Sequence, residues 1–316
     1  MKITVILCTF NRCEILAKAL ESAAYLTLPP SVEWEVLVVD NNSTDRTREV
    51  VEGFCVRDAR HFRYLFEARP GKSHALDAGI RAASGDVLAF IDDDVKAEPT
   101  WLQNLTEPLH DEKLAGSGGR ILPDWSCPPP SWLRMKERWT LAPLAIFDNG
   151  TDPGPLLQPP FGTNMAFRKS VFEKHGGFRT DLGPRPGSEI RNEDTEFGRR
   201  LLEAGEKLWY VPSAVVYHAV PKERIEKQYF LTWWLDKGRA DTREYGVPTD
   251  TPLFLAGIPL YLFRRLAIWT LRWLFAPIPS MRFAAKLKVW RVVGVMSECR
   301  RLSRVPSKPA RASRLG

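Results

Sequence analysis

Short apolar runs alternate with amphipathic stretches through the first hundred residues. Uninterrupted apolar runs predict buried strands at 3–7, 36–39 and 87–91. Helical spacing follows the first strand, and we expect Asn11 and Glu14 to form a capping box where that helix begins. The buried face of this helix should carry six apolar residues: Ile15, Leu16, Ala19, Leu20, Ala23 and Ala24. The alternation of strands and helices predicts right-handed βαβ units, and hence an α/β fold with a mostly parallel sheet.

The same kinds of pattern continue to about residue 220. Further helices are expected up to residue 54, over 75–83, after Pro99, and from Asn192 to Gly205. Further strands are expected at 161–167, 207–211 and 214–217. Between these elements, 122–162 is rich in Pro, Trp and Gly and has weak periodicity. This stretch predicts a lid or substrate loop outside the sheet core. Its tryptophans could stack on sugar faces or could pin the loop to the body: Trp125, Trp132 and Trp139.

The last third of the chain is apolar but interrupted by charge. Within 253–278, arginines 264, 265 and 272 keep every apolar run below the about 20 residues that span a bilayer. Arginines flanked by Trp and Leu suit a helix that lies in the membrane interface. The alternative is a helical pair packed on the body or on a second subunit. A second basic helix is expected at about 281–302. We therefore predict a domain over 1–220 with halves 1–121 and 122–220, a helical appendage over 221–304, and a disordered basic tail over 305–316.

Charge and cysteine content refine this picture. The net charge is +7, and residues 222–316 carry 19 basic against 7 acidic residues, which favours contact with an anionic surface. The basic residues match no groove-reading motif, so nucleic acid is not the expected partner. Five scattered cysteines without metal spacing indicate free thiols in a reducing compartment. With no signal-peptide pattern at the start, we expect a cytoplasmic protein attached peripherally to the cytoplasmic face of the membrane.

Three carboxylates follow the predicted strand at 87–91. Asp92, Asp93 and Asp94 would repel one another unless a cation or hydrogen-bond donors compensate them. Mg²⁺ and Mn²⁺ prefer oxygen ligands, and ligands of open α/β sheets bind outside the carboxyl ends of strands. The sequence therefore indicates a metal-diphosphate site at these aspartates, and a solvated acidic turn is the alternative.

Other candidate groups are ambiguous when taken singly. Asp40 could accept a hydrogen bond from a nucleobase or ribose, or could form an Asx turn. Lys72 lies at a helix start that favours phosphate, but it could also be a surface lysine. Glu193 and Asp194 open a helix, where acids usually complement the helix dipole. His218 follows a strand and would more often be structural than a ligand.

Seven motifs in one order resemble the family-2 glycosyltransferases with the GT-A fold. They lie within roughly residues 1–220, at 5–12, 38–45, 71–79, 90–94, 162–164, 176–178 and 193–194. The resemblance implies a nucleotide-binding half over 1–121 and an acceptor-side half over 122–220. It implies donor-nucleotide contacts from Thr9, Asn11, Asp40, Lys72, Asp92 and Asp93, and sugar contacts from Gly162 and Asn164. It also implies Asp94 and His218 as ligands of Mg²⁺ or Mn²⁺, and Asp194 as catalytic base with Glu193 beside it.

The resemblance implies an inverting transfer of one sugar from a nucleoside-diphosphate sugar. Processive synthases of this family carry a Gln-x-x-Arg-Trp motif after the base, and 227–234 has no arginine in that place. The acceptor would be lipid-linked, part of the cell envelope, or a saccharide. One alternative is a sugar-phosphate nucleotidylyltransferase, although 8–12 lacks the Gly-rich signature of that class. The other is a non-catalytic membrane-associated partner, against which the intact carboxylates argue.

Overall fold

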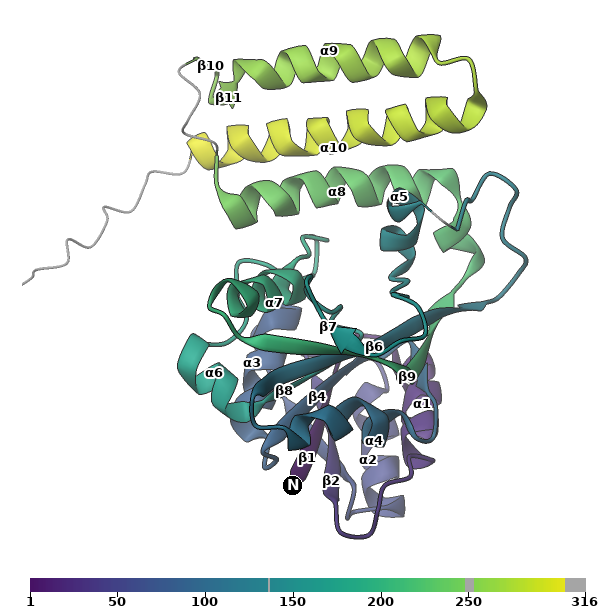
Figure 1. The fold of residues 1–316 in the computed structure, drawn as a ribbon, viewed down its shortest axis with the longest axis vertical. Coiled ribbons are helices and arrows are strands. Elements are labelled where there is room, and N and C mark those ends of the chain that lie inside the picture. Colours follow the sequence, from purple (N-terminus) through teal and green to yellow (C-terminus); the bar gives the residue numbers. More distant parts are fainter. Residues whose placement is uncertain (136, 248–252, 305–316) are drawn as a thin grey trace, which may run out of the picture. The chain divides into compact units, whose positions relative to one another are not determined.

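The computed structural model describes residues 1–135, 137–247 and 253–304. The chain divides into two compact units, Met1–Tyr229 and Phe230–Gly316 (Figure 1). The basic tail predicted at 305–316 lies outside the described residues.

The first unit is built on one mixed sheet. Among the described residues the sheet has nine strands, in the order β3-β2-β1-β4-β8-β6-β9-β5, with β7 paired to β9. The strands are β1 (Lys2–Thr9), β2 (Glu33–Asp40), β3 (Phe62–Phe66), β4 (Val87–Asp92), β5 (Val95–Ala97), β6 (Leu114–Trp125), β7 (Gly154–Pro155), β8 (Asn164–Arg168) and β9 (Lys207–Val220). Strands β3, β2, β1 and β4 are parallel, and β6 is parallel to β9. Antiparallel pairing involves β8 and the short strands β5 and β7. The predicted α/β fold with a mostly parallel sheet is confirmed.

Helices surround this sheet, and Figure 1 shows the strands running between them. They are α1 (Cys13–Ala24), α2 (Thr47–Arg57), α3 (Lys72–Ala82), α4 (Trp101–Thr106), α5 (Arg138–Leu141), α6 (Lys169–His175) and α7 (Glu193–Glu203). Short 3₁₀ turns lie at η1 (Glu107–His110), η2 (Ala142–Leu144) and η3 (Lys222–Ile225). The apolar runs recognised in the sequence form the core: Ile6, Val38 and Leu88 are fully buried. All five cysteines are free thiols, as expected.

The start of α1 differs from the prediction. The helix begins at Cys13 without a side-chain cap, so Asn11 and Glu14 form no capping box. Asn11 has a φ of 51°, and its side chain instead accepts a hydrogen bond from the backbone N–H of Thr44 at 2.7 Å. The buried face is also narrower than predicted, because Ile15 is 44% exposed and Ala24 faces solvent. The contact with the loop after β2 therefore decides the conformation of Asn11.

The second half of the sheet also differs from the prediction. Two strands expected at 207–211 and 214–217 form one strand, β9, and His218 lies within it. The pairing of β6 with β9 shifts register between Gly119 and Arg120, so residues 212–214 of β9 have no partner on β6. The strand pattern in the sequence is interrupted there, although β9 continues. Part of the predicted lid belongs to the core: β6 extends to Trp125, and Phe147 is buried and pairs with Ile121. Strands β3, β5, β6 and β7 had no counterpart in the prediction.

The second unit contains helices in the region predicted to be a helical appendage. It comprises most of α8 (Lys227–Tyr245), the hairpin of β10 (Phe254–Leu255) and β11 (Ile258–Pro259), then α9 (Leu260–Phe275) and α10 (Pro279–Ser303). Helices α8 and α10 approach closely, because a Cβ added at Gly238 or Gly294 would collide with the backbone of the other helix. Within the described part of the chain, none of the helices combines the length and the apolar content that a bilayer crossing needs.

Candidate active site

Three consecutive aspartates diverge from the carboxyl end of β4. The strand ends at Asp92, and the next two residues form the turn into β5. Each carboxylate meets a different set of donors: Asp92 with Lys72 and Thr163, Asp93 with Thr9 and Arg12, and Asp94 with Arg224. These donors lie far apart in the sequence, so the fold compensates the like charges with partners from several elements, and Arg12 also lies 3.5 Å from Asp94.

Lys72 joins Asp92 to Glu193 across the site. Its Nζ lies 2.5 Å from Asp92 Oδ1 and 3.7 Å from Glu193 Oε1. Burial alone would raise the pKa of Asp92, but Lys72 and the Thr163 hydroxyl outweigh it and hold that pKa at about 2. Burial and the neighbouring Asp194 raise the pKa of Glu193 to about 7, against the opposing effect of Lys72. The single ammonium therefore stabilises Asp92 as a carboxylate and leaves Glu193 partly protonated near neutral pH.

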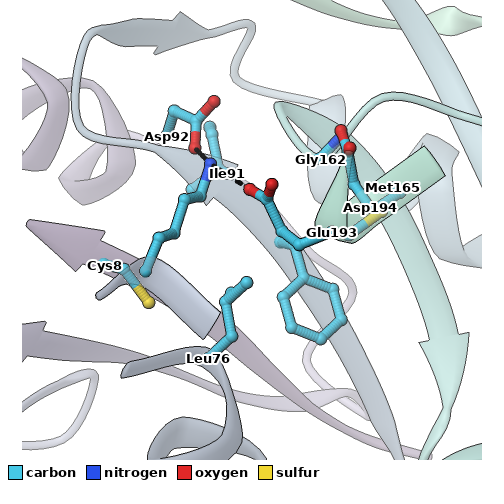
Figure 2. Close-up of a pocket in the computed structure, with 10 residues that line it drawn as sticks. Cys8, Leu76, Ile91, Asp92, Gly162, Met165, Glu193 and Asp194 are labelled. Atoms are coloured by element: carbon cyan, nitrogen blue, oxygen red, sulfur yellow. Dashed lines mark hydrogen bonds and ion pairs between the residues drawn. The ribbon is translucent and has the colours of Figure 1, made fainter. Parts of the chain in front are cut away.

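These groups line a small cavity. It has a volume of about 10 Å³, roughly the space that one water needs. Figure 2 shows the carboxylates of Asp92 and Glu193 directed toward the same space, with Gly162 and Asp194 beside it. The first aspartate of the predicted trio and the acidic pair about a hundred residues later therefore line one cavity. An intact sugar does not fit inside it with the Lys72 bridge in place.

Asp194 is held by backbone donors. Its Oδ2 accepts a hydrogen bond from the Gly162 N–H at 2.6 Å, and its Oδ1 accepts from the Thr195 N–H at 2.7 Å. The side chain is half-buried, whereas Glu193 is buried. Of the two acids, Asp194 is therefore the one with a fixed orientation and access to solvent.

Asp93 lies on the side of the first strand. Its carboxylate accepts from the Thr9 hydroxyl at 2.8 Å and from Arg12 at 3.0 Å. Burial raises the pKa of Asp93 to about 6, Arg12 opposes this rise, and the adjacent Asp94 adds to it. Thr9 thus contacts the aspartate trio.

Asp94 and His218 are neighbours because β5 pairs with β9. The register places Val95 opposite His218, and the two side chains come within 3.5 Å, Asp94 Oδ1 to His218 Nε2. Burial lowers the pKa of His218, and Asp94 opposes this only in part. The two predicted metal ligands therefore come together, with the guanidinium of Arg224 against both.

Asp40 and Asn11 hold the ends of the first two strands together. Asp40 is buried and accepts from the Ser43 N–H and the Tyr64 hydroxyl, each at 2.9 Å. Asn11 accepts from the Thr44 N–H of the same loop. Both therefore lie at the carboxyl edge of the sheet, where the sequence predicts a nucleotide.

Asn164 is fully buried in the sheet. Its Oδ1 accepts from the Trp101 indole at 2.8 Å, and its Nδ2 donates to the carbonyls of Arg120 and Ala214. With both ends of the amide engaged, Asn164 ties α4, β6 and β9 to β8. The hydrogen bonds of the Asn164 amide are therefore made within the protein, and the sugar contact predicted for Asn164 stays a prediction.

Comparison with protein families decides the class. Residues 4–176, more than half of the chain, match the family model Glycosyl transferase family 2. The chain is a family 2 glycosyltransferase. The predicted family and enzyme class are confirmed.

Named relatives and a solved structure agree with this class. A glucosyl-dolichyl phosphate glucuronosyltransferase of Haloferax volcanii is 29% identical over 74% of this chain and 75% of its own length. The succinoglycan biosynthesis protein ExoM of Rhizobium meliloti is 28% identical over 76% of this chain and 72% of its own length. A mannosyltransferase of Pyrobaculum calidifontis, solved with GDP-Man and Mn²⁺, has a TM-score of 0.64 at 17% identity, covering 94% of this chain and 86% of that one. The last likeness confirms the GT-A type of fold.

Asp94 and His218 bring one carboxylate and one imidazole together. Within the described residues, no three His, Cys, Asp or Glu side chains converge on one point. Mg²⁺ is usually bound by one or two carboxylates together with substrate phosphates, so a complete protein cage is not required. Asp94, with Nε2 of His218 beside it, fits such a partial site.

Two arginines of this site were not among the predicted site residues. Arg12 is the last residue of the matched motif 5–12, so its place after the first strand was the available signal. Arg224 had no such signal, because it meets Asp94 from 130 residues away through the pairing of β5 with β9.

Proposed function

We propose that this glycosyltransferase moves a single sugar from a nucleoside-diphosphate sugar to a hydroxyl of a lipid-linked, cell-envelope or saccharide acceptor, with inversion. The observation that carries the proposal is that Asp92 and Asp194 line the same cavity. The closed cavity is too small for a hexose, so donor binding must displace the Lys72 bridge or place the sugar at the mouth.

Asp194 is the proposed general base. It is accessible, and two backbone donors fix its orientation, so it can receive the proton of an acceptor hydroxyl that approaches from the solvent side. Attack on the face opposite the leaving diphosphate inverts the anomeric centre. Base assistance of this kind is typically worth about 10²–10⁴-fold in rate. Glu193, buried against Lys72, is proposed to position the helix start that carries Asp194.

The donor nucleotide is proposed to bind at the carboxyl edge of β1, β2 and β4. Five of the predicted nucleotide contacts lie at or just after the ends of these three strands: Thr9, Asn11, Asp40, Asp92 and Asp93. Lys72 begins α3, where the helix end and its ammonium both favour an anion. Asp94 and His218 would hold Mg²⁺ or Mn²⁺ together with diphosphate oxygens. The cation, when bound, would neutralise charge on the leaving diphosphate.

The relatives support the proposed acceptor class. One is named for transfer to glucosyl-dolichyl phosphate, which is lipid-linked, and another for succinoglycan biosynthesis. The alternative of a nucleotidylyltransferase has no support from these names. The absence of the processive motif at 227–234 supports transfer of one sugar at a time.

The second unit is proposed to attach the enzyme to a membrane surface. Helix α9 exposes several large apolar side chains, among them Leu271, Leu274 and Phe275. Residues 253–304 also carry ten basic residues and one acidic residue. An apolar face among arginines and lysines suits an interface with anionic lipid.

A panel of nucleotide sugars tests this function. Each donor is incubated with the enzyme and Mn²⁺ and scored for slow hydrolysis and for a rise in melting temperature, because a ligand bound by the native state raises apparent stability. We expect one nucleotide sugar to do both, and the released sugar to have inverted configuration. Release of pyrophosphate from a sugar 1-phosphate and a nucleoside triphosphate would instead support the nucleotidylyltransferase.

A further inference from the structure

Arg224 already engages the two side chains that the proposed cation needs. One guanidinium nitrogen lies 2.8 Å from His218 Nε2, and the other lies 2.8 Å from Asp94 Oδ2. The nitrogen beside Nε2 also lies 3.5 Å from His218 Nδ1, so the guanidinium lies close against the imidazole and places its positive charge between His218 and Asp94. His218 is buried and the side chain of Asp94 is 9% exposed, which leaves little room for a second cation beside the arginine.

We infer that Arg224 and the divalent cation exclude one another at this pair, so that the cation binds only after Arg224 has moved away. The inference rests on the proposed metal site. A metal ligand must offer a free lone pair, and a cation must also overcome the positive charge that is already tethered there. Arg224 is therefore an internal competitor that lowers the affinity of the free enzyme for Mg²⁺ or Mn²⁺.

The position of Arg224 allows such a movement. It lies on η3, a short turn that follows β9, and the neighbouring Ile225 is buried and anchors that turn. The long arginine side chain can thus leave while the turn stays in place. Arg12 does not duplicate this function, because it lies 3.0 Å from Asp93 Oδ1 and approaches Asp94 Oδ2 only at 3.5 Å.

A released guanidinium needs another anion, and the donor supplies one. The diphosphate can accept hydrogen bonds from Arg224 while its oxygens complete the coordination of the cation. Donor and cation should therefore bind cooperatively, each raising the affinity for the other by the same factor. Removal of Arg224 should weaken this coupling.

Calorimetric titration with Mn²⁺ tests the inference without measuring transfer. Arg224→Met should bind Mn²⁺ alone about tenfold more tightly than the wild type, since a charge-assisted contact to each ligand atom is lost. Lys222→Met is the matched control, because Lys222 is an exposed cation on the same turn. It should leave the affinity for Mn²⁺ unchanged. Addition of UDP or GDP should strengthen Mn²⁺ binding more in the wild type than in Arg224→Met.

Two further variants separate the possible failures. Arg224→Lys keeps the positive charge but not the two guanidinium nitrogens that contact Asp94 and His218. Its affinity for Mn²⁺ should therefore lie between those of the wild type and Arg224→Met. This variant replaces Arg224→Met in the test if Arg224→Met does not fold. Asp94→Asn should abolish Mn²⁺ binding. One outcome is that the wild type and Arg224→Met bind Mn²⁺ with equal affinity, while Asp94→Asn does not bind it. This outcome would overturn the inference about Arg224 and would still support the metal site. Absence of Mn²⁺ binding in every protein, with UDP or GDP present, would overturn the metal site and the inference together.

Discussion

The backbone N–H of Gly162 donates to Asp194 at 2.6 Å, and a Cβ added at Gly162 would lie 3.1 Å from the same carboxylate oxygen. The absence of a side chain at Gly162 therefore lets the strand entry at β8 approach the start of α7. This contact fixes the orientation of the proposed base from the far side of the cavity.

The first prediction concerns this contact. Gly162→Ala should push the Asp194 carboxylate from its position by a few tenths of an ångström, and kcat should fall by about tenfold, because general-base catalysis depends on hydrogen-bond reach. Binding of UDP or GDP, measured by calorimetry, should change little. Gly53→Ala is the control, because Gly53 lies in α2 and nothing would meet its added Cβ within 4 Å. An equal loss of nucleotide binding and kcat in Gly162→Ala would contradict this role.

The second prediction concerns the base itself. Asp194→Asn keeps an oxygen that can accept from the Gly162 N–H but cannot take a proton from the acceptor. We expect kcat to fall by about 10²–10⁴-fold while donor affinity stays within roughly threefold of the wild type. Single-turnover transfer and calorimetry measure the two quantities separately. Asp152→Asn, an exposed aspartate elsewhere in the unit, should have no effect.

Much of the fold follows from local sequence, and much of the site does not. The apolar run 87–91 predicted β4, and therefore the edge at which Asp92 lies. The positive φ of Asn11 depends on Thr44, 33 residues away, so a capping pattern read from neighbouring residues was wrong there. The contact of Arg224 with Asp94 also depends on residues far apart in the sequence, because it follows from the pairing of β5 with β9. Contacts made by tertiary structure leave no periodic trace in the sequence.

The third prediction concerns the Lys72 bridge. Lys72→Met removes the cation and leaves Asp92 and Glu193 without it in a largely buried site. Breaking a buried ion pair by removing one partner costs about 3 kcal/mol of unfolding free energy. Adding Asp92→Asn should recover part of that loss, because the double variant no longer holds an uncompensated Asp92 carboxylate. Urea denaturation of the single and double variants measures this, and simple additivity of their effects would contradict the bridge.

The fourth prediction concerns the apolar face of α9. Leu271 is 55% exposed and Phe275 is 76% exposed. The double variant Leu271→Asp/Phe275→Asp therefore places two carboxylates on this face. Binding to phosphatidylglycerol vesicles should fall by about tenfold or more, because buried apolar contact and attraction to anionic lipid are both reduced. Val56→Asp is the control, since Val56 is 87% exposed but lies on α2. Unchanged sedimentation with vesicles would indicate that this face meets a protein instead.

The fifth prediction concerns a buried carboxylate that joins the first three strands. Glu35 on β2 accepts from the Thr4 hydroxyl at 2.8 Å, from Arg63 at 2.7 Å and from the Ser84 hydroxyl at 2.6 Å. Burial alone would raise the pKa of Glu35, but these hydrogen bonds outweigh it and lower the pKa from its model-peptide value of 4.5 to about 2. A lowered carboxylate pKa stabilises the folded state above 4.5, and this stabilisation is lost as the pH falls toward 2.

Glu35→Gln should therefore lower the unfolding free energy at pH 7 by about 2–3 kcal/mol, because one pKa unit corresponds to about 1.4 kcal/mol. The amide also places a donor at one of the two oxygen positions, where Glu35 accepts from Arg63 on one side and from Thr4 and Ser84 on the other. The difference from the wild type should shrink between pH 4.5 and 2, where the wild-type carboxylate loses its advantage. Glu33→Gln on the same strand is the control, because Glu33 is 75% exposed and its ion pair with Lys2 is 4.0 Å long. Urea titrations measure the unfolding free energies of the wild type and Glu35→Gln. If their difference stays constant from pH 7 to pH 3, the loss of stability in Glu35→Gln comes from packing and not from charge.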